Sequence, residues 1–593
     1  MKRLLLSLLL SGTAASSFAQ LNFRWAKGIE GFGYSQQVQG TQVLPYKDNT
    51  VYMAGLFIRK ADFDPGPGVD SIVNIQFDLN SYLSKYDSAG AYVWTKQAPG
   101  RGAYALDTAG NIYVAGMFDT TRDFDPGPGV TSFTPTHNDL YLMKLDKNYN
   151  LLWAKKAGTC SAEFQVNDIK VSSAGEIYVG GYFSGIADFN PTASVNGTTS
   201  FQATLRDGFL AKYSSTGTFV WVSDVFGQGG DAVYQIALDG SGNPAITGYT
   251  GNGLSVANST TVFRGVGSAF SLPADPNFVN AMVAKYNSSG SVQWARAVKG
   301  AHCYGNAATI DKNGAIYFGG VFNGTVVLET GNAASSITAS AGASDAYLAK
   351  LSPTGTYLWS KIYGSNSDDA VFGLSVDTAA DVYVTGMYSG SMNLNPSGSS
   401  TVTATNNGYR DGFMARYTSA GTYKWSTNFG SIYHDEPAAI AVGQDGALYG
   451  TGYVSAATNL NLGGTSSGQV TFLYTQPGQT YQPKAYLIRY GLPKPKNTGV
   501  NNAAELPNEL TLYPNPTAGN VILKGMLNLT PGTPIRITVM DAIGKVVFTS
   551  EESANTGLFQ KEIHLSGQLA EGIYTVSVSA QGLSSVNKLV VIH

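Results

Sequence analysis

The chain has 593 residues, of which 13% are charged, and it contains 70 glycines and 35 tyrosines. This length favours two or more domains, and low charge with abundant Gly and Tyr favours strands and turns over helices. The net charge of -3 offers no basic surface, so we expect no nucleic-acid partner. Cys160 and Cys303 alone exclude a disulfide framework, and we expect both to be packed and unpaired.

The first 19 residues have the pattern of a secretory signal peptide. Residues 1–3 (MKR) are basic, residues 4–10 form an apolar run too short to span a bilayer, and residues 17–19 (SFA) precede a cleavage site. We therefore expect residues 1–19 to be removed on export.

The seven tryptophans of the chain recur at intervals of 59 to 73 residues. Such even spacing of a rare residue indicates one structural unit repeated along the chain. The tryptophans are Trp25, Trp94, Trp153, Trp221, Trp294, Trp359 and Trp425.

Each repeat predicts four antiparallel strands. A short apolar strand leads through a Gly, Asn or Asp turn into a second strand with the pattern Tyr-x-x-Gly-x-aromatic. A glycine inside a strand indicates a bend or the close approach of another backbone, for example near the centre of a ring. This glycine recurs as Gly55, Gly116, Gly181, Gly248, Gly320, Gly386 and Gly452.

The third strand carries a basic residue at a fixed position, and a turn then leads to the tryptophan strand. Seven cations could surround a central channel, or each stem could cover apolar surface while its head reaches solvent or a carboxylate. Aspartates that often precede the same strand (Asp139, Asp207, Asp345 and Asp411) favour the second interpretation. The basic residues are Lys85, Lys144, Lys212, Lys285, Lys350, Arg416 and Arg489.

Four strands in each of seven repeats predict an all-β fold with a seven-bladed β-propeller over residues 20–491. Residues 23–27 read as a fourth strand without three strands before it, whereas the last repeat, ending at residue 490, lacks a tryptophan strand. We therefore predict that residues 23–27 complete the last blade and close the ring. The repeats resemble bacterial β-propeller repeats called SBBP repeats, as in DGFLAKY at 207–213. This resemblance implies the fold and no shared activity.

The C-terminal part differs in character. Residues 492–508 form a polar linker with three prolines, and residues 509–593 predict short strands of a small immunoglobulin-like β-sandwich. This segment contains YPNP at 513–516, DAIGK at 541–545 and LAEGIY at 569–574, and it ends with KLVV at 588–591. It is similar to the type A C-terminal sorting domain of the type IX secretion system of Bacteroidetes. The residues that carry the resemblance include Pro514, Asn515, Pro516, Gly519, Gly544, Gly572, Tyr574 and Lys588.

The resemblance implies two partners for this segment, the outer-membrane translocon and a sortase-like peptidase that removes the tail. The cargo would then be secreted or attached to the outer cell surface. The alternative is an immunoglobulin-like adhesion module that stays on the mature protein.

One motif suggests a metal, and no other cofactor is expected. The sequence DFDPGPG occurs twice and supplies two aspartates each time, Asp62 with Asp64 and Asp123 with Asp125. These carboxylates could bind calcium, although two fall short of the six to eight oxygens that calcium takes. The alternative is a Pro/Gly turn that its aspartates cap.

These features predict a secreted or surface-displayed monomer that binds a glycan or a protein without catalysis. One alternative is a glycan lyase or hydrolase with acids gathered over the propeller channel, and another is a structural component of the cell surface. Acids that follow tryptophan strands could gather at one opening or be solvated loop residues. They are Asp231, Asp368, Asp369, Asp435 and Glu436.

Overall fold

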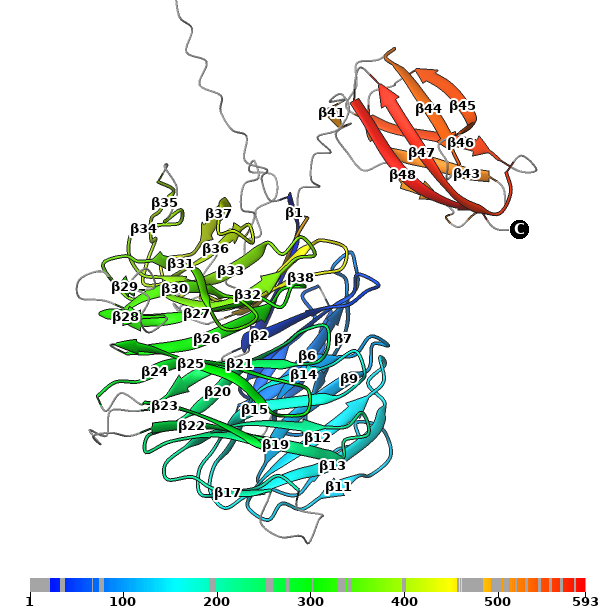
Figure 1. Cartoon of the computed structure of the whole chain (residues 1–593). Helices are drawn as coiled ribbons and strands as arrows, with labels where there is room; N and C mark the ends of the chain where they lie inside the picture. The colour runs from blue at the N-terminus through cyan, green and yellow to red at the C-terminus, as the bar shows by residue number, and fades with distance from the viewer. Residues whose placement is uncertain are drawn as a thin grey trace, which may run out of the picture. The chain divides into compact units, whose positions relative to one another are not determined.

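The protein is described from a computed structural model, which divides into two compact units, Met1–Pro493 and Lys494–His593 (Figure 1). The signal peptide predicted at 1–19 and most of the linker predicted at 492–508 lie outside the described residues. The structure describes residues 22–31, 38–66, 68–73, 79–190, 199–251, 260–273, 277–300, 302–328, 336–339, 344–396, 401–455, 458, 460, 484–491, 504–505, 511–513, 515, 517, 520–527, 532–541, 545–553, 557–565, 569–580 and 583–591.

Strands alone make up the regular structure of these residues. In this part of the chain we find no helix with the length and apolarity that a membrane span requires. Cys160 and Cys303 are buried and free, as predicted.

The first unit repeats a motif of four antiparallel strands, and we number the described sheets 1 to 7 by their first strands. First strands are β2 (Val38–Pro45), β8 (Arg101–Leu106), β14 (Phe164–Val171), β20 (Ala232–Leu238), β26 (Cys303–Ile310), β32 (Ala370–Val376) and β38 (Glu436–Val442). Second strands are β3 (Val51–Phe57), β9 (Ile112–Phe118), β15 (Ile177–Phe183), β21 (Pro244–Thr250), β27 (Ile316–Asn323), β33 (Val382–Tyr388) and β39 (Leu448–Val454).

Third strands are β6 (Asn80–Tyr86), β12 (Asn138–Leu145), β18 (Asp207–Tyr213), β24 (Asn280–Tyr286), β30 (Ser344–Leu351), β36 (Asp411–Tyr417) and β40 (Lys484–Gly491). Fourth strands are β7 (Tyr92–Gln97), β13 (Leu151–Cys160), β19 (Phe219–Phe226), β25 (Val292–Gly300), β31 (Tyr357–Tyr363), β37 (Tyr423–Phe429) and, for sheet 7, β1 (Asn22–Gly31).

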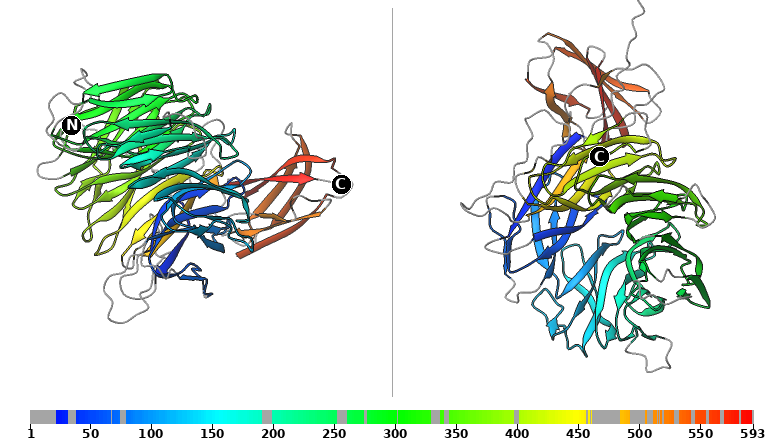
Figure 2. Two further views of the ribbon diagram at one scale, coloured as in Figure 1. Left: turned by 90° about the horizontal axis from the view of Figure 1, so that it is seen from below. Right: turned by 90° about the vertical axis from the view of Figure 1, so that its left-hand side faces the viewer.

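The two ends of this unit meet in sheet 7. Strand β1 pairs antiparallel with β40, with Trp25 opposite Arg489 and Ile29 opposite Ala485. The prediction that residues 23–27 complete the last repeat is therefore confirmed. The first strands contact one another in series from β2 to β38, and β38 contacts β2, so that sheet 7 lies beside sheet 1 (Figures 1 and 2). The arrangement is propeller-like.

Polar side chains link these first strands to one another. The carboxylate of Asp168 in β14 accepts the backbone N–H of Ile236 in β20 at 2.9 Å, and the Gln235 amide oxygen accepts that of Ala308 in β26 at 2.9 Å. The two backbone N–H groups face a neighbouring sheet and have no partner strand on that side within the described residues, so these side chains satisfy them. Hydrogen bonds between side chains and backbone therefore add to the packing between neighbouring sheets.

The recurring glycine of the second strand is explained by a close backbone approach. In six of the seven sheets a β-bulge lies in the first strand opposite it, for example between Val233 and Gln235 opposite Gly248. A Cβ atom on Gly248 would overlap the carbonyl oxygen of Ala232, and the other six glycines face an equivalent carbonyl. The predicted approach of another backbone is confirmed, but that backbone belongs to the same sheet.

The recurring tryptophan packs against the hairpin turn of the next sheet. Trp221 and Trp294 lie against Gly290 and Gly355, whose φ angles are +89° and +83°. The Trp294 indole N–H also donates to the Pro353 carbonyl of that turn at 3.0 Å. Glycine is favoured here because φ is positive, although in sheet 2 Tyr149 takes the equivalent position with φ +71° and packs against Trp94. The tryptophan therefore recurs because it makes the same contact with the next sheet in successive repeats.

The recurring basic residue lies over the tyrosine that opens the second-strand pattern. Lys350 Nζ lies 4.6 Å from the Tyr317 ring centroid and 3.5 Å from Asp311 Oδ2, and it donates to the Ser419 carbonyl of the next sheet at 2.8 Å. The interpretation that the head reaches a nearby carboxylate is confirmed. The partner differs from the predicted one: it is the turn acid Asp311, rather than Asp345 at the start of the strand.

The sequence analysis did not predict the short hairpins inserted between second and third strands. Four of the six described hairpins pair with the fourth strand of the preceding sheet, which interlocks neighbours. The hairpins are β4 (Lys60–Asp62) with β5 (Ser71–Val73), β10 (Arg122–Asp123) with β11 (Ser132–Phe133), β16 (Ile186–Asp188) with β17 (Ser200–Gln202), β22 (Thr260–Gly265) with β23 (Ser268–Pro273), β28 (Thr325–Val327) with β29 (Ser336–Thr338), and β34 (Met392–Asn393) with β35 (Thr403–Ala404).

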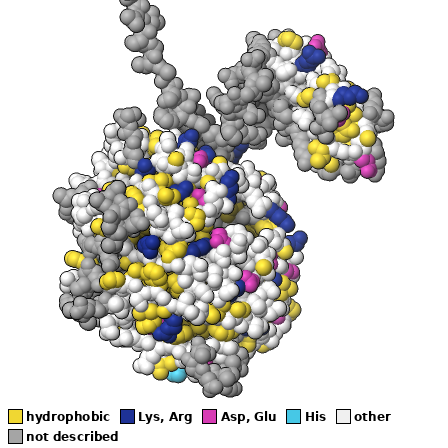
Figure 3. Space-filling view, viewed as in Figure 1, with side chains coloured by type: hydrophobic (Ala, Val, Ile, Leu, Met, Phe, Trp, Pro, Cys, Tyr) yellow, Lys and Arg dark blue, Asp and Glu magenta, His cyan; other side chains and the backbone are white. Residues whose placement is uncertain are grey.

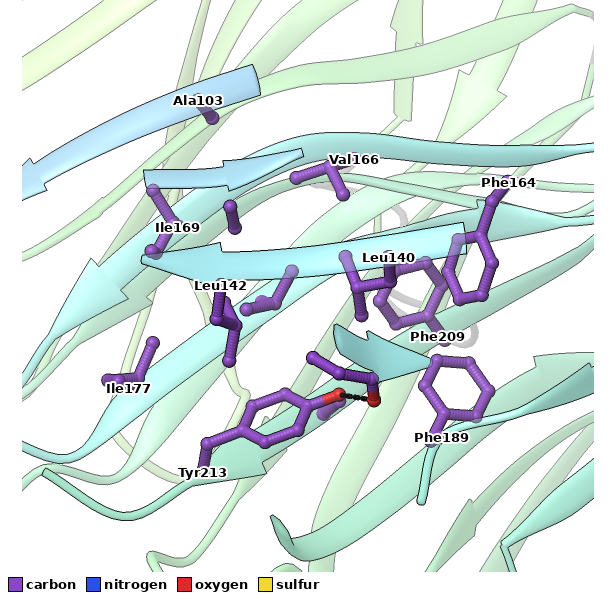
Figure 4. Close-up of a cluster of buried hydrophobic side chains, with 14 of the residues drawn as sticks. Ala103, Leu140, Leu142, Phe164, Val166, Ile169, Ile177, Phe189, Phe209 and Tyr213 are labelled. Carbon is purple, nitrogen blue, oxygen red and sulfur yellow. Dashed lines mark hydrogen bonds between the residues drawn. The ribbon is translucent and has the colours of Figure 1, made fainter. Parts of the chain in front are cut away.

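The hydrophobic core lies between neighbouring sheets. In the cluster shown in Figure 4, Leu140 and Leu142 of sheet 2 pack with Phe164 and Phe209 of sheet 3. The Tyr213 hydroxyl in this layer donates to the Ala157 carbonyl at 3.2 Å. Apolar burial between sheets is therefore the main force that holds the repeats together.

The second unit has two sheets around one hydrophobic cluster, which includes Val521, Ile537 and Val576. The short strands predicted in this segment are confirmed. The strands are β41 (Ala504–Glu505), β42 (Thr511–Tyr513), β43 (Asn520–Leu527), β44 (Pro534–Met540), β45 (Val546–Ser553), β46 (Gly557–His564), β47 (Gly572–Ala580) and β48 (Leu583–Val591).

Candidate functional site

The loops proposed to bind calcium are capped turns that close the inserted hairpins. Asp62 Oδ1 accepts the backbone N–H groups of Asp64 at 3.2 Å and Asp70 at 3.0 Å, and Asp123 makes the same bonds in its loop. Asn393 forms the equivalent turn with an amide oxygen. The aspartates thus serve the turn, as the alternative interpretation held. Within the described residues no group of three or more metal-binding side chains occurs.

The phenylalanine of this motif has a separate role. Phe63 and Phe124 are buried, and the Phe63 ring centroid lies 4.7 Å from that of Tyr82 in β6 of sheet 1. The motif therefore attaches the hairpin to the core through its aromatic residue, whereas its aspartates fix the turn. Calcium binding by Asp62, Asp64, Asp123 and Asp125 stays a prediction.

Three of the acids grouped as potential catalytic carboxylates lie between neighbouring sheets: Asp231, Asp369 and Asp435 have no exposed surface. Asp435 accepts the backbone N–H groups of Ser431 at 2.6 Å and Ser455 at 3.0 Å, and Asp369 makes equivalent bonds. Each carboxylate ties the connection after a tryptophan strand to the second strand of the next sheet. The expectation that these three are solvated or exposed at an opening is wrong, because the chain folds over them.

Burial raises the pKa values of these carboxyls. The pKa of Asp369 rises to about 7, and that of Asp231 lies well above its usual value, with burial the main cause in both. Asp207, which begins β18 and faces Asp231, has its pKa raised to about 7 by burial and by nearby Asp224. Burial disfavours the charged form of a carboxyl group, and a second carboxylate nearby disfavours it further. These groups are therefore partly protonated near neutral pH.

A different group of side chains has the character of a binding site. Four tyrosines from three neighbouring sheets gather around an arginine–glutamate pair, and all six side chains are at least partly exposed. We call this group the Arg206 cluster. Its members are Glu163, Tyr182 and Arg206 of sheet 3, Tyr234 and Tyr249 of sheet 4, and Tyr304 of sheet 5.

The polar half of the Arg206 cluster is an ion pair beside an aromatic ring. Arg206 Nη2 lies 3.1 Å from Glu163 Oε2, and the guanidinium carbon lies 4.8 Å from the Tyr182 ring centroid. The Tyr182 hydroxyl donates to Glu163 Oε1 at 3.0 Å. The three side chains hold one another in place, so the Arg206 head is positioned in advance of any ligand.

The aromatic half crosses from sheet 4 to sheet 5. The ring centroids of Tyr234 and Tyr249 are 5.4 Å apart at 61°, and those of Tyr249 and Tyr304 are 5.5 Å apart at 65°. Edge-to-face pairs at this separation are favourable. Because strands rather than loops carry the rings, the surface that they form is rigid.

Local backbone structure explains these positions. Tyr182 and Tyr249 follow the recurring glycine in their second strands, and Tyr234 is the extra residue of the β20 bulge. Tyr304 lies in β26, opposite Val321. The same register in each sheet therefore brings these residues to the same end of their strands.

The electrostatics of the cluster suit an uncharged ligand. Burial raises the pKa values of Tyr182, Tyr234 and Tyr249, which keeps their hydroxyls protonated and able to donate. The charges of Arg206 and Glu163 offset each other. The visible face of the protein in Figure 3 carries scattered charges of both signs among uncharged side chains. The cluster can therefore stack against a ligand and exchange hydrogen bonds with it, without a net charge to attract an ion.

The sequence analysis missed this cluster, although a signal was present. The position after the recurring glycine is aliphatic in four repeats (Leu56, Met117, Val321 and Met387) and tyrosine in Tyr182, Tyr249 and Tyr453. Residues that vary within a conserved repeat pattern are candidates for function, since the fold does not require them.

Among the sorting-signal residues, Asn515 holds the end of the second unit together. Its side-chain oxygen accepts the backbone N–H of Val590 in β48 at 2.9 Å, and the Tyr574 hydroxyl donates to the Ala570 carbonyl at 2.9 Å. Gly572 begins β47, and Lys588 lies in β48 opposite Thr575. Pro514, Pro516, Gly519 and Gly544 lie outside the described residues.

Comparison with known proteins identifies the second unit. Residues 511–592 match the family described as the secretion system C-terminal sorting domain. This domain marks the chain for export to the cell surface or for secretion, and it implies interaction with the type IX secretion machinery.

The remaining similarities are weak. A region of 211 residues is 28% identical to an uncharacterized WD repeat-containing protein of Acanthamoeba polyphaga mimivirus, covering 32% of this chain and 15% of that protein. The structure of PorZ, described as an essential bacterial surface component of the type-IX secretion system of Porphyromonas gingivalis, is 10% identical with a TM-score of 0.16 and covers 96% of this chain and 100% of that chain. A glycoside hydrolase family 32 structure from Bifidobacterium adolescentis is 9% identical with a TM-score of 0.21, covering 96% and 95%. Such TM-scores support no argument about fold or function.

Proposed function

We propose that the chain is a seven-bladed β-propeller of SBBP-like repeats that is exported by the type IX system and binds an extracellular glycan or protein without catalysis. The Arg206 cluster carries this proposal, because four partly exposed tyrosines around an ion pair serve no evident structural need. Seven four-stranded motifs in a closed series support the propeller. The two sheets of the second unit support an immunoglobulin-like sandwich, which a sortase-like peptidase removes after export.

Binding is favoured over catalysis by the state of the acids near the cluster. A glycosidase needs two carboxyl groups that face one substrate. Glu163 is held by Arg206 and Tyr182, and Asp231 is buried beneath the strand ends. The acids are therefore committed to structural contacts, whereas the tyrosine rings keep partly exposed surface for a ligand.

The proposal is tested with the exported chain on arrays of glycans and matrix proteins. In the variant, Tyr182→Leu and Tyr249→Leu are combined, and Met117→Leu is the control at the same strand position of sheet 2. Leucine is tolerated at this position, because Leu56 occupies it in sheet 1. We expect a ligand that binds the parent and the control at least ten-fold more tightly than the variant. Equal binding by all three, or turnover of a ligand, would overturn the proposal.

A further inference from the structure

A second group of arginine, acid and tyrosine lies in sheets 6 and 7. Arg206 and Arg410 hold the same position, directly before the third strand. The carbonyl of Arg206 accepts the N–H of Asp231 at 2.8 Å, and that of Arg410 accepts the N–H of Asp435 at 2.8 Å. Both arginines also form a parallel bridge to the next sheet. Their backbones are therefore equivalent.

The side chains around Arg410 also form an arginine–glutamate pair, but Glu436 belongs to the next sheet, whereas Glu163 belongs to the sheet of Arg206. Arg410 Nη1 lies 2.8 Å from Glu436 Oε1. Tyr453 follows the recurring glycine in β39, as Tyr249 does in β21. The pKa of Arg410 is raised, first by its hydrogen bond to Glu436 and further by the nearby Tyr453 and Asp368. An arginine, an acid and a tyrosine thus meet again at the end of the strands.

The second group adds an exposed aromatic stack. Tyr409 is 65% exposed, and its ring lies nearly parallel to His434, with centroids 5.2 Å apart and planes at 21°. Leu205 takes the place of Tyr409 in the first group and is 43% exposed. A large apolar side chain therefore lies in the open beside each arginine. We call Asp368, Tyr409, Arg410, His434, Glu436 and Tyr453 the Arg410 cluster.

The interfaces between these two groups lack such an arrangement. The position of the arginine is Val279 in sheet 4 and Ser344 in sheet 5, where the same backbone bond forms at 2.9 Å and 2.8 Å. The fold thus requires no arginine at this position.

We propose that the Arg410 cluster is a second binding site and that both clusters bind a neutral polysaccharide. This inference rests on the function proposed for the Arg206 cluster. Tyrosine rings supply stacking faces with a polar tip, and each ion pair supplies donors and acceptors for sugar hydroxyls. Each arginine is already engaged by a carboxylate, so an acidic polymer meets no spare positive charge. Each cluster has six side chains, whereas a stable protein interface takes about 20–30 residues on each side.

Two similar sites favour a long chain over a short one. When both sites hold one polymer, the second contact forms at the high effective concentration set by the first. The gain reaches two to four orders of magnitude over a single site in favourable geometry. A polymer is therefore the ligand that uses both sites.

The test measures stoichiometry and affinity of the exported chain by calorimetry. The probes are the neutral polymers laminarin, mannan and galactan, their short oligosaccharides, and polygalacturonate as the acidic polymer. The variants are Tyr249→Leu in the first site and Tyr409→Ala in the second. Because Tyr409 is exposed, its removal leaves folding intact; Val130→Ala, at a side chain that is 78% exposed, is the matched control.

We expect two oligosaccharides of one neutral type to bind each parent chain and each Val130→Ala chain, and one to bind each single variant. Affinity for the polymer falls at least ten-fold in either variant. One oligosaccharide per parent chain, full binding by Tyr409→Ala, or a preference for polygalacturonate would overturn the inference while leaving the proposed function intact. If the parent binds none of the probes, the inference falls; the proposed function falls with it only when the arrays also find no ligand that depends on Tyr182 and Tyr249.

Discussion

The close backbone approach at the recurring glycine can be tested by adding a single Cβ atom there. Gly248 lies in β21 opposite the β20 bulge, and a Cβ atom there would overlap the Ala232 carbonyl oxygen at a separation that real Cβ atoms essentially never show. The obstacle is backbone within a hydrogen-bonded sheet, so it cannot turn aside as a flexible side chain would. We therefore expect Gly248→Ala to destabilise the first unit.

The size of the effect follows from the cost of overpacking, which is about 1–3 kcal/mol for one added group in a well-packed core. Unfolding entropy is about 2.1 cal/mol/K per residue, so a unit of this length has roughly 1 kcal/mol/K. The melting temperature should thus fall by roughly 1–3 °C. Urea unfolding followed by tryptophan fluorescence measures the same change as a lower midpoint.

Gly240→Ala is the matched control, since a Cβ atom there has nothing within 4 Å and Gly240 precedes Gly248 in the same hairpin. Both variants lose the flexibility of glycine in the unfolded chain, so their difference isolates the overlap. The control should stay within about 0.5 kcal/mol of the parent. Equal stability of the two variants would refute the explanation that the backbone opposite the bulge requires glycine at this position.

Two further predictions concern charged groups. Asp207 and Asp369 have pKa values raised to about 7, above the unfolded value near 4, so the folded state binds more protons in that interval and stability falls as pH rises through it. The urea midpoint should therefore be higher at pH 5 than at pH 8, and Asp207→Asn should flatten this slope; a midpoint that rises toward pH 8 contradicts the assignment. In the calcium motif, Asn393 sustains the same turn as Asp123, so Asp123→Asn should keep its stability within about 0.5 kcal/mol. Calorimetric melting with millimolar calcium then decides the metal: a shift in the parent that the variant lacks supports binding, and no shift in the parent excludes it.

Sequence alone predicted what the repeat enforces at every copy. The tryptophan and the strand glycine each make a contact that recurs at the same positions of the repeat, such as that of Trp294 with Gly355. A requirement met in all seven repeats, as for the glycine, or in most of them, as for the tryptophan, leaves a period in the sequence. The pairing of β1 with β40 was predictable for the same reason, because a fourth strand was missing at one end of the chain and left over at the other.

Sequence reasoning failed where the partners lie on other strands or in other sheets. The lysine heads were assigned to the aspartate beside them in the chain, whereas Lys350 reaches Asp311 across the sheet and Ser419 in the next one. The burial of Asp369 and Asp435 was missed because it depends on serines and strand ends that fold over them. Distances between sheets are not encoded in the spacing of residues within one repeat.

The Arg206 cluster follows from both observations. A closed series of sheets repeats one backbone, so equivalent positions lie at the same end of every sheet, and a change at such a position alters the surface without altering the fold. Leu56, Met117 and Val321 show the aliphatic residue that packing alone accepts, whereas Tyr182 and Tyr249 depart from it in adjacent sheets. Departures in neighbouring repeats become one contiguous surface once the sheets are placed side by side. In a repeat protein, the binding site is therefore to be sought among positions where the repeat is broken, and the fold among positions where it is kept.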